Sequence, residues 1–132
     1  DNSQRVSSVL NRDAKAYGKK FLTDGSEETC WNSDQGSPQW ISIELAKPAT
    51  VTRIELMFQG GFAGKDCEVL GVSSSGNDGV WQSLGKFYPE DVNRLQISFL
   101  SRVKVVFGAS TDFFGRIVVY LFDVIGEEVE GV

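Results

Sequence analysis

Apolar and polar residues alternate along several short stretches of the chain. Between residues 40 and 45 every odd-numbered position is aliphatic, whereas the even-numbered positions are Trp40, Ser42 and Glu44. Successive side chains of a β-strand point to opposite faces, so a period of two is typical of a strand with one buried face. We therefore predict a strand here, with its aliphatic face toward the core and with Lys47-Pro48 ending it.

Alternating or short apolar stretches recur at fairly regular intervals. They predict further strands over residues 51–58, 67–72, 80–87, 95–99, 102–107 and 115–126. Ile54, Leu56 and Phe58 share one face of their strand, and Val103, Val105 and Phe107 are expected inside. Gly60-Gly61 and the turn-rich residues 73–79 separate strands, and residues 88–91 are expected to form a loop. Only residues 11–21 resemble helical turns, and Gly18 interrupts them. This pattern indicates an all-β fold, an antiparallel sandwich or barrel.

Length and composition are consistent with one domain over residues 1–132. The chain is 41% hydrophobic and 23% charged, which is ordinary for a globular protein. Its formal net charge of -5 argues against a nucleic-acid partner and against a membrane surface, because phosphates and anionic headgroups repel an acidic protein. No apolar run approaches the roughly 20 residues that span a bilayer. We expect the acidic end, residues 127–130, to be frayed.

Histidine is absent, and this removes several chemistries. Ser-His-Asp and Cys-His catalysis both require it, so only carboxylate chemistry would remain for an enzyme. The adjacent acidic pairs Glu27-Glu28 and Glu90-Asp91 are expected to be solvated, so we predict a non-enzymatic protein. Cys30 and Cys67 are too few for a tetrahedral zinc site. We expect both to be free, inert thiols of an intracellular protein.

A family resemblance rests on several segments in a fixed order. Residues 23–31 contain Asp24-Gly25, Thr29 and Trp31 in an arrangement that resembles the D-G-x-x-x-T-x-W signature of discoidin (coagulation factor 5/8 type C) domains. Residues 38–45, 51–54, 67–81 and 115–126 resemble the strands that follow in this family. The resemblance covers residues 5–128. It implies a jelly roll of the galactose-binding-like type, with Trp31, Trp40 and Trp81 packed in the core.

The resemblance also implies a calcium site around the Asp24 turn. In the calcium-binding relatives, the matching ligands are the side chains of Asp24 and Thr29 and the main-chain carbonyls of Phe21 and Glu27. The glutamate that completes the family's site falls at Leu121, although Asp123 follows on the same face. Read from the residues alone, Asp24 instead caps its own turn. Calcium is thus a cofactor that the resemblance allows, and we expect none to be required.

Aromatic residues in glycine-bounded loops form a candidate binding site. Phe62 follows Gly60-Gly61, and Phe113-Phe114 precedes Gly115. Two adjacent aromatics cannot both face inward, so at least one of Phe113 and Phe114 should be exposed, as contact residues often are. Asn32, Gln59, Asp112 and Arg116 complete the candidate set. Two alternatives stay open: the loops plug the end of the barrel, and Arg116 forms a structural ion pair with Asp112 or Asp34.

Longer blocks carry a narrower resemblance. Residues 28–36, 58–62, 87–91 and 111–116 resemble an intracellular branch of the discoidin family whose members associate with a nuclear receptor. This resemblance implies a non-catalytic protein-interaction module that represses a nuclear receptor, located in the nucleus or cytoplasm. The alternative is a lectin-like, carbohydrate-binding domain with a structural calcium ion. The lack of histidine weakens that alternative, because many sugar-binding relatives use one in these loops.

Overall fold

The computed structural model describes residues 3–26, 28–73, 80–87 and 100–128. The predictions for the turn at 73–79, apart from Ser73, for the loop at 88–91, for the strand at 95–99 and for the end of the acidic tail lie outside these residues, as does Glu27. In the described part of the chain, no helix is long and apolar enough to span a bilayer.

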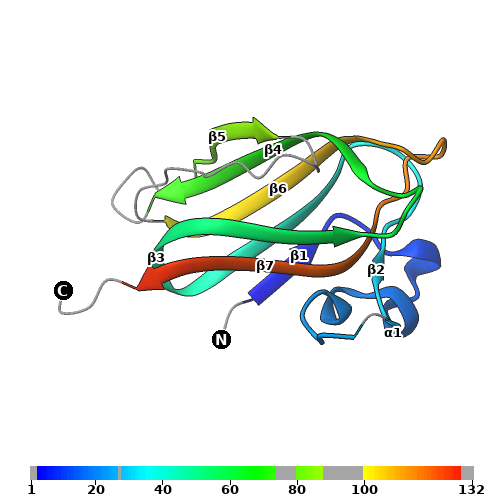
Figure 1. Ribbon diagram of the computed structural model, residues 1–132, viewed down its shortest axis with the longest axis horizontal. Coiled ribbons are helices and arrows are strands. Elements are labelled where there is room, and N and C mark those ends of the chain that lie inside the picture. The colour runs from blue at the N-terminus through cyan, green and yellow to red at the C-terminus, as the bar shows by residue number, and fades with distance from the viewer. Residues whose placement is uncertain (1–2, 27, 74–79, 88–99, 129–132) are drawn as a thin grey trace.

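The described residues form mostly antiparallel strands (Figure 1). Strands are β1 Ser3–Val6, β2 Trp31–Asn32, β3 Gln39–Phe58, β4 Gly64–Ser73, β5 Gln82–Phe87, β6 Leu100–Ser110 and β7 Val118–Glu128. The helical turns are η1 Leu10–Arg12, α1 Ala14–Tyr17 and η2 Lys19–Leu22. They fall where helical turns were predicted, and Gly18 separates α1 from η2. A Cβ at this position would lie 2.4 Å from the Ala14 carbonyl oxygen, so only glycine fits. The all-β prediction is confirmed.

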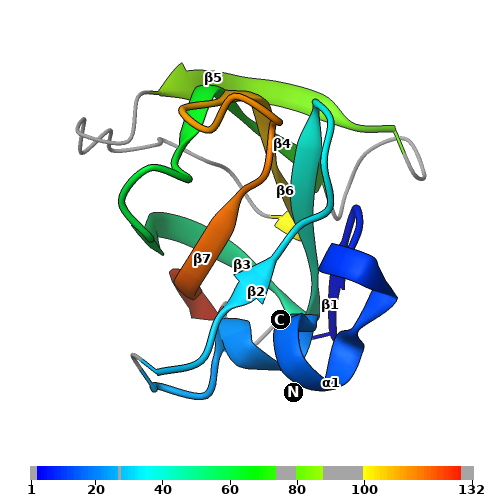
Figure 2. The ribbon, with the colours of Figure 1, turned by 90° about the vertical axis from the view of Figure 1, so that its right-hand side faces the viewer.

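Strand β3 belongs to both layers of the fold. Its first half pairs with β1 on one side and β6 on the other, and its second half pairs with β7. Figures 1 and 2 show how the strand bends between these halves. The layers are therefore β1-β3-β6-β4-β5 and β3-β7-β2. The prediction that Lys47-Pro48 ends the strand is wrong: the register with β6 shifts between Glu44 and Ala49, and proline is tolerated at such an irregularity.

The core lies between the two layers, and it is built from the faces that alternation predicted. Buried residues include Ile41, Ile43, Val103, Val105 and Phe107, and the side chains of Ile54, Leu56 and Phe58 pack against them. The rings of Phe58 and Phe107 meet edge to face across the layers, with centroids 5.5 Å apart. Trp31 is fully buried, as expected.

Trp40 and Trp81 are not part of this core. Both are only partly buried and line a hollow on the outer face of the larger layer. The alternation of residues 40–45 explains the position of Trp40, because the neighbouring Ile41 faces inward and Trp40 must then face outward. The expectation that all three tryptophans pack in the core is therefore wrong for these two.

The core position of Ile41 leads to a stability prediction. Its side chain is fully buried, so Ile41→Ala should lower the free energy of unfolding by about 2–5 kcal/mol through lost burial and a residual cavity. Met57→Ala is the control, because Met57 is 44% exposed and its truncation should change stability by less than about 0.5 kcal/mol. Urea unfolding measures both. Equal effects of the two substitutions would contradict the assignment of the core.

Candidate functional site

Three loops meet at one end of the sandwich, and we call them the rim: residues 33–38, 59–63 and 111–117 (Figures 1 and 2). Backbone hydrogen bonds tie them together. The Thr111 N–H donates to the Ala63 carbonyl at 2.9 Å, and the Gly36 N–H donates to the Phe114 carbonyl at 2.8 Å. Segments distant in the sequence are thereby held side by side in a single surface.

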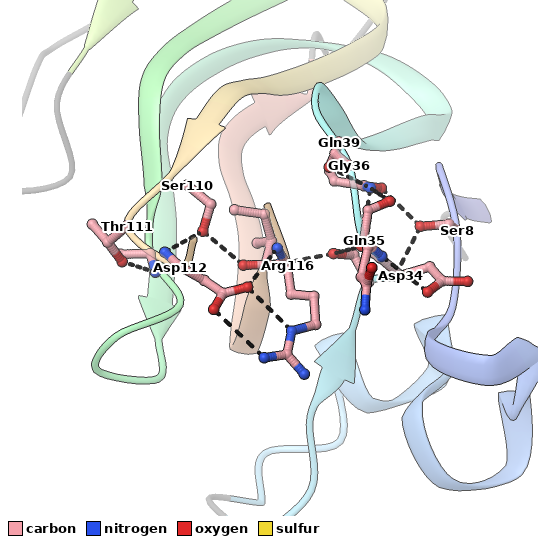
Figure 3. A network of polar contacts seen from close by, with 12 residues as sticks. Ser8, Asp34, Gln35, Gly36, Gln39, Ser110, Thr111, Asp112 and Arg116 are labelled. Carbon is pink, nitrogen blue, oxygen red and sulfur yellow. Dashed lines mark hydrogen bonds and ion pairs between the residues drawn. The ribbon is translucent and has the colours of Figure 1, made fainter. Parts of the chain in front are cut away.

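Arg116 is the charged centre of the rim. Its Nε donates to Asp112 Oδ2 at 3.1 Å, and its backbone N–H donates to the same oxygen at 3.0 Å (Figure 3). The guanidinium carbon lies 5.3 Å from the centroid of the Phe62 ring and 5.7 Å from that of Phe114, within the range of cation–π attraction. The predicted ion pair between Arg116 and Asp112 is confirmed. The hydrogen bonds from Arg116 hold the pKa of Asp112 below its ordinary value.

The two adjacent phenylalanines of the rim are both exposed. Phe113 is 92% exposed and Phe114 is 54% exposed, and their rings meet edge to face at 5.3 Å. The expectation that at least one of them faces solvent is confirmed. A plug for the end of the barrel would bury both rings, so these two residues do not form one. An apolar ring that is almost entirely in water is a candidate contact residue.

The two amide residues of the candidate set lie at the edge of this cluster. The Gln59 side-chain oxygen accepts from the Tyr120 hydroxyl at 3.1 Å, so this amide is partly engaged within the protein. Asn32 lies on β2 opposite Val118, and among the described residues its buried Oδ1 has no hydrogen-bond partner. Direct contacts thus join Phe62, Asp112, Phe114 and Arg116, whereas Asn32 and Gln59 flank them.

A buried glutamine, Gln39, holds the 33–38 loop of the rim through side-chain hydrogen bonds. The Gln39 side-chain oxygen accepts from the hydroxyls of Ser7 and Ser8, and its amide nitrogen donates to the Gly36 carbonyl at 2.9 Å (Figure 3). Gln39 is 5% exposed. Gln39 shares the inward face of β3 with Ile41, so the alternation of residues 39–45 already indicated a buried polar side chain at this position. Gln39 was not among the predicted site residues.

Gly115 lets the 111–117 loop approach the 33–38 loop closely. Its φ is +84°, and a Cβ at this position would lie 2.8 Å from the Gly36 carbonyl oxygen. Beside it, the Ser110 hydroxyl donates to the Arg116 carbonyl at 2.7 Å, and the Ile117 N–H donates to the buried Ser33 hydroxyl at 2.7 Å. These contacts set the backbone from which Phe113 and Phe114 project.

The Asp24 turn has the geometry of a self-capped turn. Asp24 Oδ1 accepts from the Ser26 N–H at 3.0 Å, and Oδ2 accepts from the Thr29 hydroxyl. These hydrogen bonds, that of Thr29 first, lower the pKa of Asp24. Calcium favours several carboxylate and carbonyl oxygens, whereas here one carboxylate accepts hydrogen bonds within its own turn and the Leu121 side chain offers no oxygen. The described residues therefore fit a calcium ion poorly.

Neither cysteine has the surroundings of a reactive thiol. Both are free; Cys67 is buried and Cys30 is half-buried. Burial, together with the nearby Asp66, raises the pKa of Cys67 to about 12, and burial also raises that of Cys30. A thiolate is the reactive form, so the raised pKa values disfavour reaction of both thiols at neutral pH. Among the described residues, no cluster of three or more acidic or thiol groups could hold a metal ion.

Comparison with known proteins identifies relatives over most of the chain. Residues 21–106 match the family described as NedA-like, galactose-binding domain, an F5/8 type C family. The "Nuclear receptor 2C2-associated protein" of Danio rerio is 50% identical over 130 residues, covering 94% of this chain and 90% of that protein. The Xenopus laevis protein of the same name is 52% identical over 127 residues, covering 92% and 91%.

Solved structures agree with the fold. A chitosan-binding module 1 from a Paenibacillus chitosanase/glucanase superposes with a TM-score of 0.74 at 21% identity, covering 95% of both chains. At this identity the likeness concerns the fold alone.

The engaged oxygens of Asp24 lead to a prediction about calcium. Millimolar Ca²⁺, compared with EDTA, should change the melting temperature by less than about 1 °C. An ion that binds only the folded state, at a free concentration one hundred times its Kd, would add about 2.7 kcal/mol to the free energy of unfolding and raise the melting temperature by several degrees. Thermal unfolding followed by circular dichroism makes the comparison. A rise of several degrees that Asp24→Asn abolishes would establish the calcium site.

The ion pair at the centre of the rim predicts a pH response. The lowered pKa of Asp112 means that the pair persists above the ordinary aspartate pKa of 3.8 and breaks only as pH falls through the lower, folded-state value. The NMR resonance of the Arg116 Nε–H should therefore stay constant down to about pH 4 and move below it. Asp112→Asn should remove this transition. A midpoint at or above 3.8 in the wild-type protein would contradict the assignment.

Proposed function

Because the chain belongs to the F5/8 type C family, and within it to the nuclear receptor 2C2-associated proteins, we propose that it is a binding module whose partner is a nuclear receptor. The family and the names of its relatives suggest a non-enzymatic role. The absence of histidine from the sequence supports this view, since it removes the usual proton shuttle. The finer proposals are repression of the receptor and a location in the nucleus or cytoplasm.

The exposed ring of Phe113 carries the proposal for the contact surface. Covering a large exposed apolar side chain with a partner removes apolar surface from water and is therefore favourable. Aromatic residues with a nearby arginine are also typical of interface hot spots. The loop that bears Phe113 is held by the Asp112–Arg116 pair and by the Gly36–Phe114 hydrogen bond. Little ordering entropy would then be lost on binding.

The polar members of the rim would orient the partner. Arg116 lies between the rings of Phe62 and Phe114, and its side chain is 29% exposed despite the ion pair. Its remaining N–H groups could donate to a carboxylate or carbonyl at the edge of the contact. Gln59 supplies an amide on the neighbouring 59–63 loop, and Asn32 supplies one at the end of β2. We therefore propose an interface with an aromatic centre and a polar margin.

Carbohydrate binding is the second candidate for the same rim. It is favoured by the structural likeness to a chitosan-binding module, which argues by analogy of fold. Aromatic rings, an arginine and amides are groups that can hold a sugar. The Arg116 guanidinium already contacts the rings of Phe62 and Phe114, so a sugar would have to compete with it for those faces. We therefore rank this function below receptor binding.

The proposed contact is tested by truncating its most exposed ring. Phe113→Ala should weaken binding to purified full-length nuclear receptor 2C2 by about tenfold or more, as expected for a hot-spot aromatic. Surface plasmon resonance with the full chain measures the dissociation constant. The melting temperature should not change, because the ring is 92% exposed.

A matched control separates the rim from apolar surface in general. Met57→Ala removes another exposed apolar side chain, from the smaller layer, and should leave the affinity unchanged. If neither the Phe113→Ala variant nor the double variant Phe113→Ala/Arg116→Ala binds more weakly than the wild type, the rim is not the contact. If the wild type does not bind the receptor, the partner is wrong, and a glycan array then tests the second candidate.

A further inference from the structure

The outer face of the larger layer carries a groove that is separate from the rim. It is a hollow of about 200 Å³ whose lining includes Arg5 from β1, Trp40 and Glu44 from β3, Arg102 and Lys104 from β6, and Trp81 just before β5. Strand register explains the grouping. Lys104 lies opposite Ser42, Arg102 lies opposite Glu44, and Arg5 lies opposite Ser42 on the other side of β3.

Lys104 is held between the two tryptophans of the groove. Its Nζ lies 4.8 Å from the centroid of the Trp40 ring and 4.7 Å from that of Trp81. The electron-rich ring faces attract the ammonium and fix its position, but they do not neutralise its charge. The ammonium is thus already placed for an anionic ligand, whose binding would cost less side-chain entropy than at a free surface lysine.

The groove is cationic on an acidic protein. Three cationic side chains line it against the single carboxylate of Glu44, whereas the whole chain has a net charge of -5. Among the described residues, no ion pair joins Arg5, Arg102 or Lys104 to a carboxylate. Glu68 of the neighbouring strand does not line the groove, and its carboxylate accepts from the Ser83 hydroxyl at 2.8 Å. The uncompensated charge favours an anionic partner.

Size and spacing indicate the form of that partner. Pockets that enclose a whole small molecule measure about 300–1,000 Å³, so this hollow suits side chains entering from a larger ligand. Arg102 and Lys104 are two residues apart on β6, which places them about 7 Å apart on the same face. Alternate side chains of an extended peptide have the same spacing. We propose that this groove binds an extended acidic peptide segment that carries carboxylates at alternate positions.

The test titrates the full chain with a short, end-blocked peptide in which glutamate alternates with threonine. Binding should change the fluorescence of Trp40 and Trp81, because Lys104 rests on both rings, and it should weaken as salt is added. Lys104→Met and Arg102→Gln should each weaken binding about three- to tenfold. Two variants are used so that the test survives if one of them alters the fold, which the melting temperature reveals.

Three controls decide the interpretation. Lys15→Gln, an exposed residue of α1, makes the same change in net charge and should leave binding unchanged. A peptide with equally many glutamates at every third position should bind at least about threefold more weakly, because its carboxylates alternate between faces. Phe113→Ala should have no effect, since the groove and the rim are separate sites.

Several results would overturn the proposal. They are the absence of binding by the alternating peptide, equal weakening by Lys15→Gln and Lys104→Met, and equal affinity for the two peptides. Tighter binding of heparin than of the peptide, with the same dependence on Lys104 and Arg102, would assign the groove to an acidic glycan instead. Failure of receptor binding through the rim would leave these outcomes unaffected, because each site has its own variants.

Discussion

The passage of strand β3 from one layer to the other is the constraint on which the rest of the structure depends. Because the strand bends, its first residue, Gln39, and its last residue, Phe58, both lie at the rim. Residues 33–38 precede the strand and residues 59–63 follow it. The third rim loop joins β6 to β7, which are the partners of the two halves of β3. One strand thus brings together the core, formed between its halves, and the surface that we propose for binding.

Hydrogen bonds within the protein hold most polar groups of the rim, and they favour a fixed backbone there. Gln39 is buried, and an unpaired amide there would cost about 1–3 kcal/mol, so its bonds to two serine hydroxyls and to the 34–36 carbonyls are needed for stability. The pair between Asp112 and Arg116 similarly closes the 111–117 loop. The large side chains that stay exposed on this surface are apolar, the rings of Phe113 and Phe114. An exposed apolar group on a fixed backbone is suited to recognition rather than to chemistry.

Charge is distributed differently over the two candidate surfaces. At the rim, the central cation Arg116 has an internal counter-ion and two aromatic neighbours. In the groove, Lys104 has two aromatic neighbours and, among the described residues, no ion pair, and Arg102 lies two residues away. An acidic protein that keeps uncompensated cations on one face can steer an acidic partner to that face while repelling it elsewhere. The two surfaces would then recognise different features of a partner, apolar area at the rim and carboxylates in the groove.

The sequence by itself determined the class of fold, most strand positions and the inward faces of the strands, because alternation with a period of two is a local property. Residues 41, 43, 103, 105 and 107 followed it in the structure. The sequence also allowed the pairing of Asp112 with Arg116 to be predicted, because the two residues are four apart in one loop. The family resemblance added the connectivity of a jelly roll, and it misplaced Trp40 and Trp81 in the core.

Only the tertiary structure decided which loops form the rim and which side chains line the groove. Phe62 meets Arg116, and Trp40 meets Lys104, through strand pairings and bends that join residues more than 50 positions apart. The same holds for β3, where proline predicted an end and the strand instead continued into the second layer. Such neighbours depend on register and layer packing, which are set by the whole core at once, whereas the periodicity of one segment reports only which of its own faces is buried.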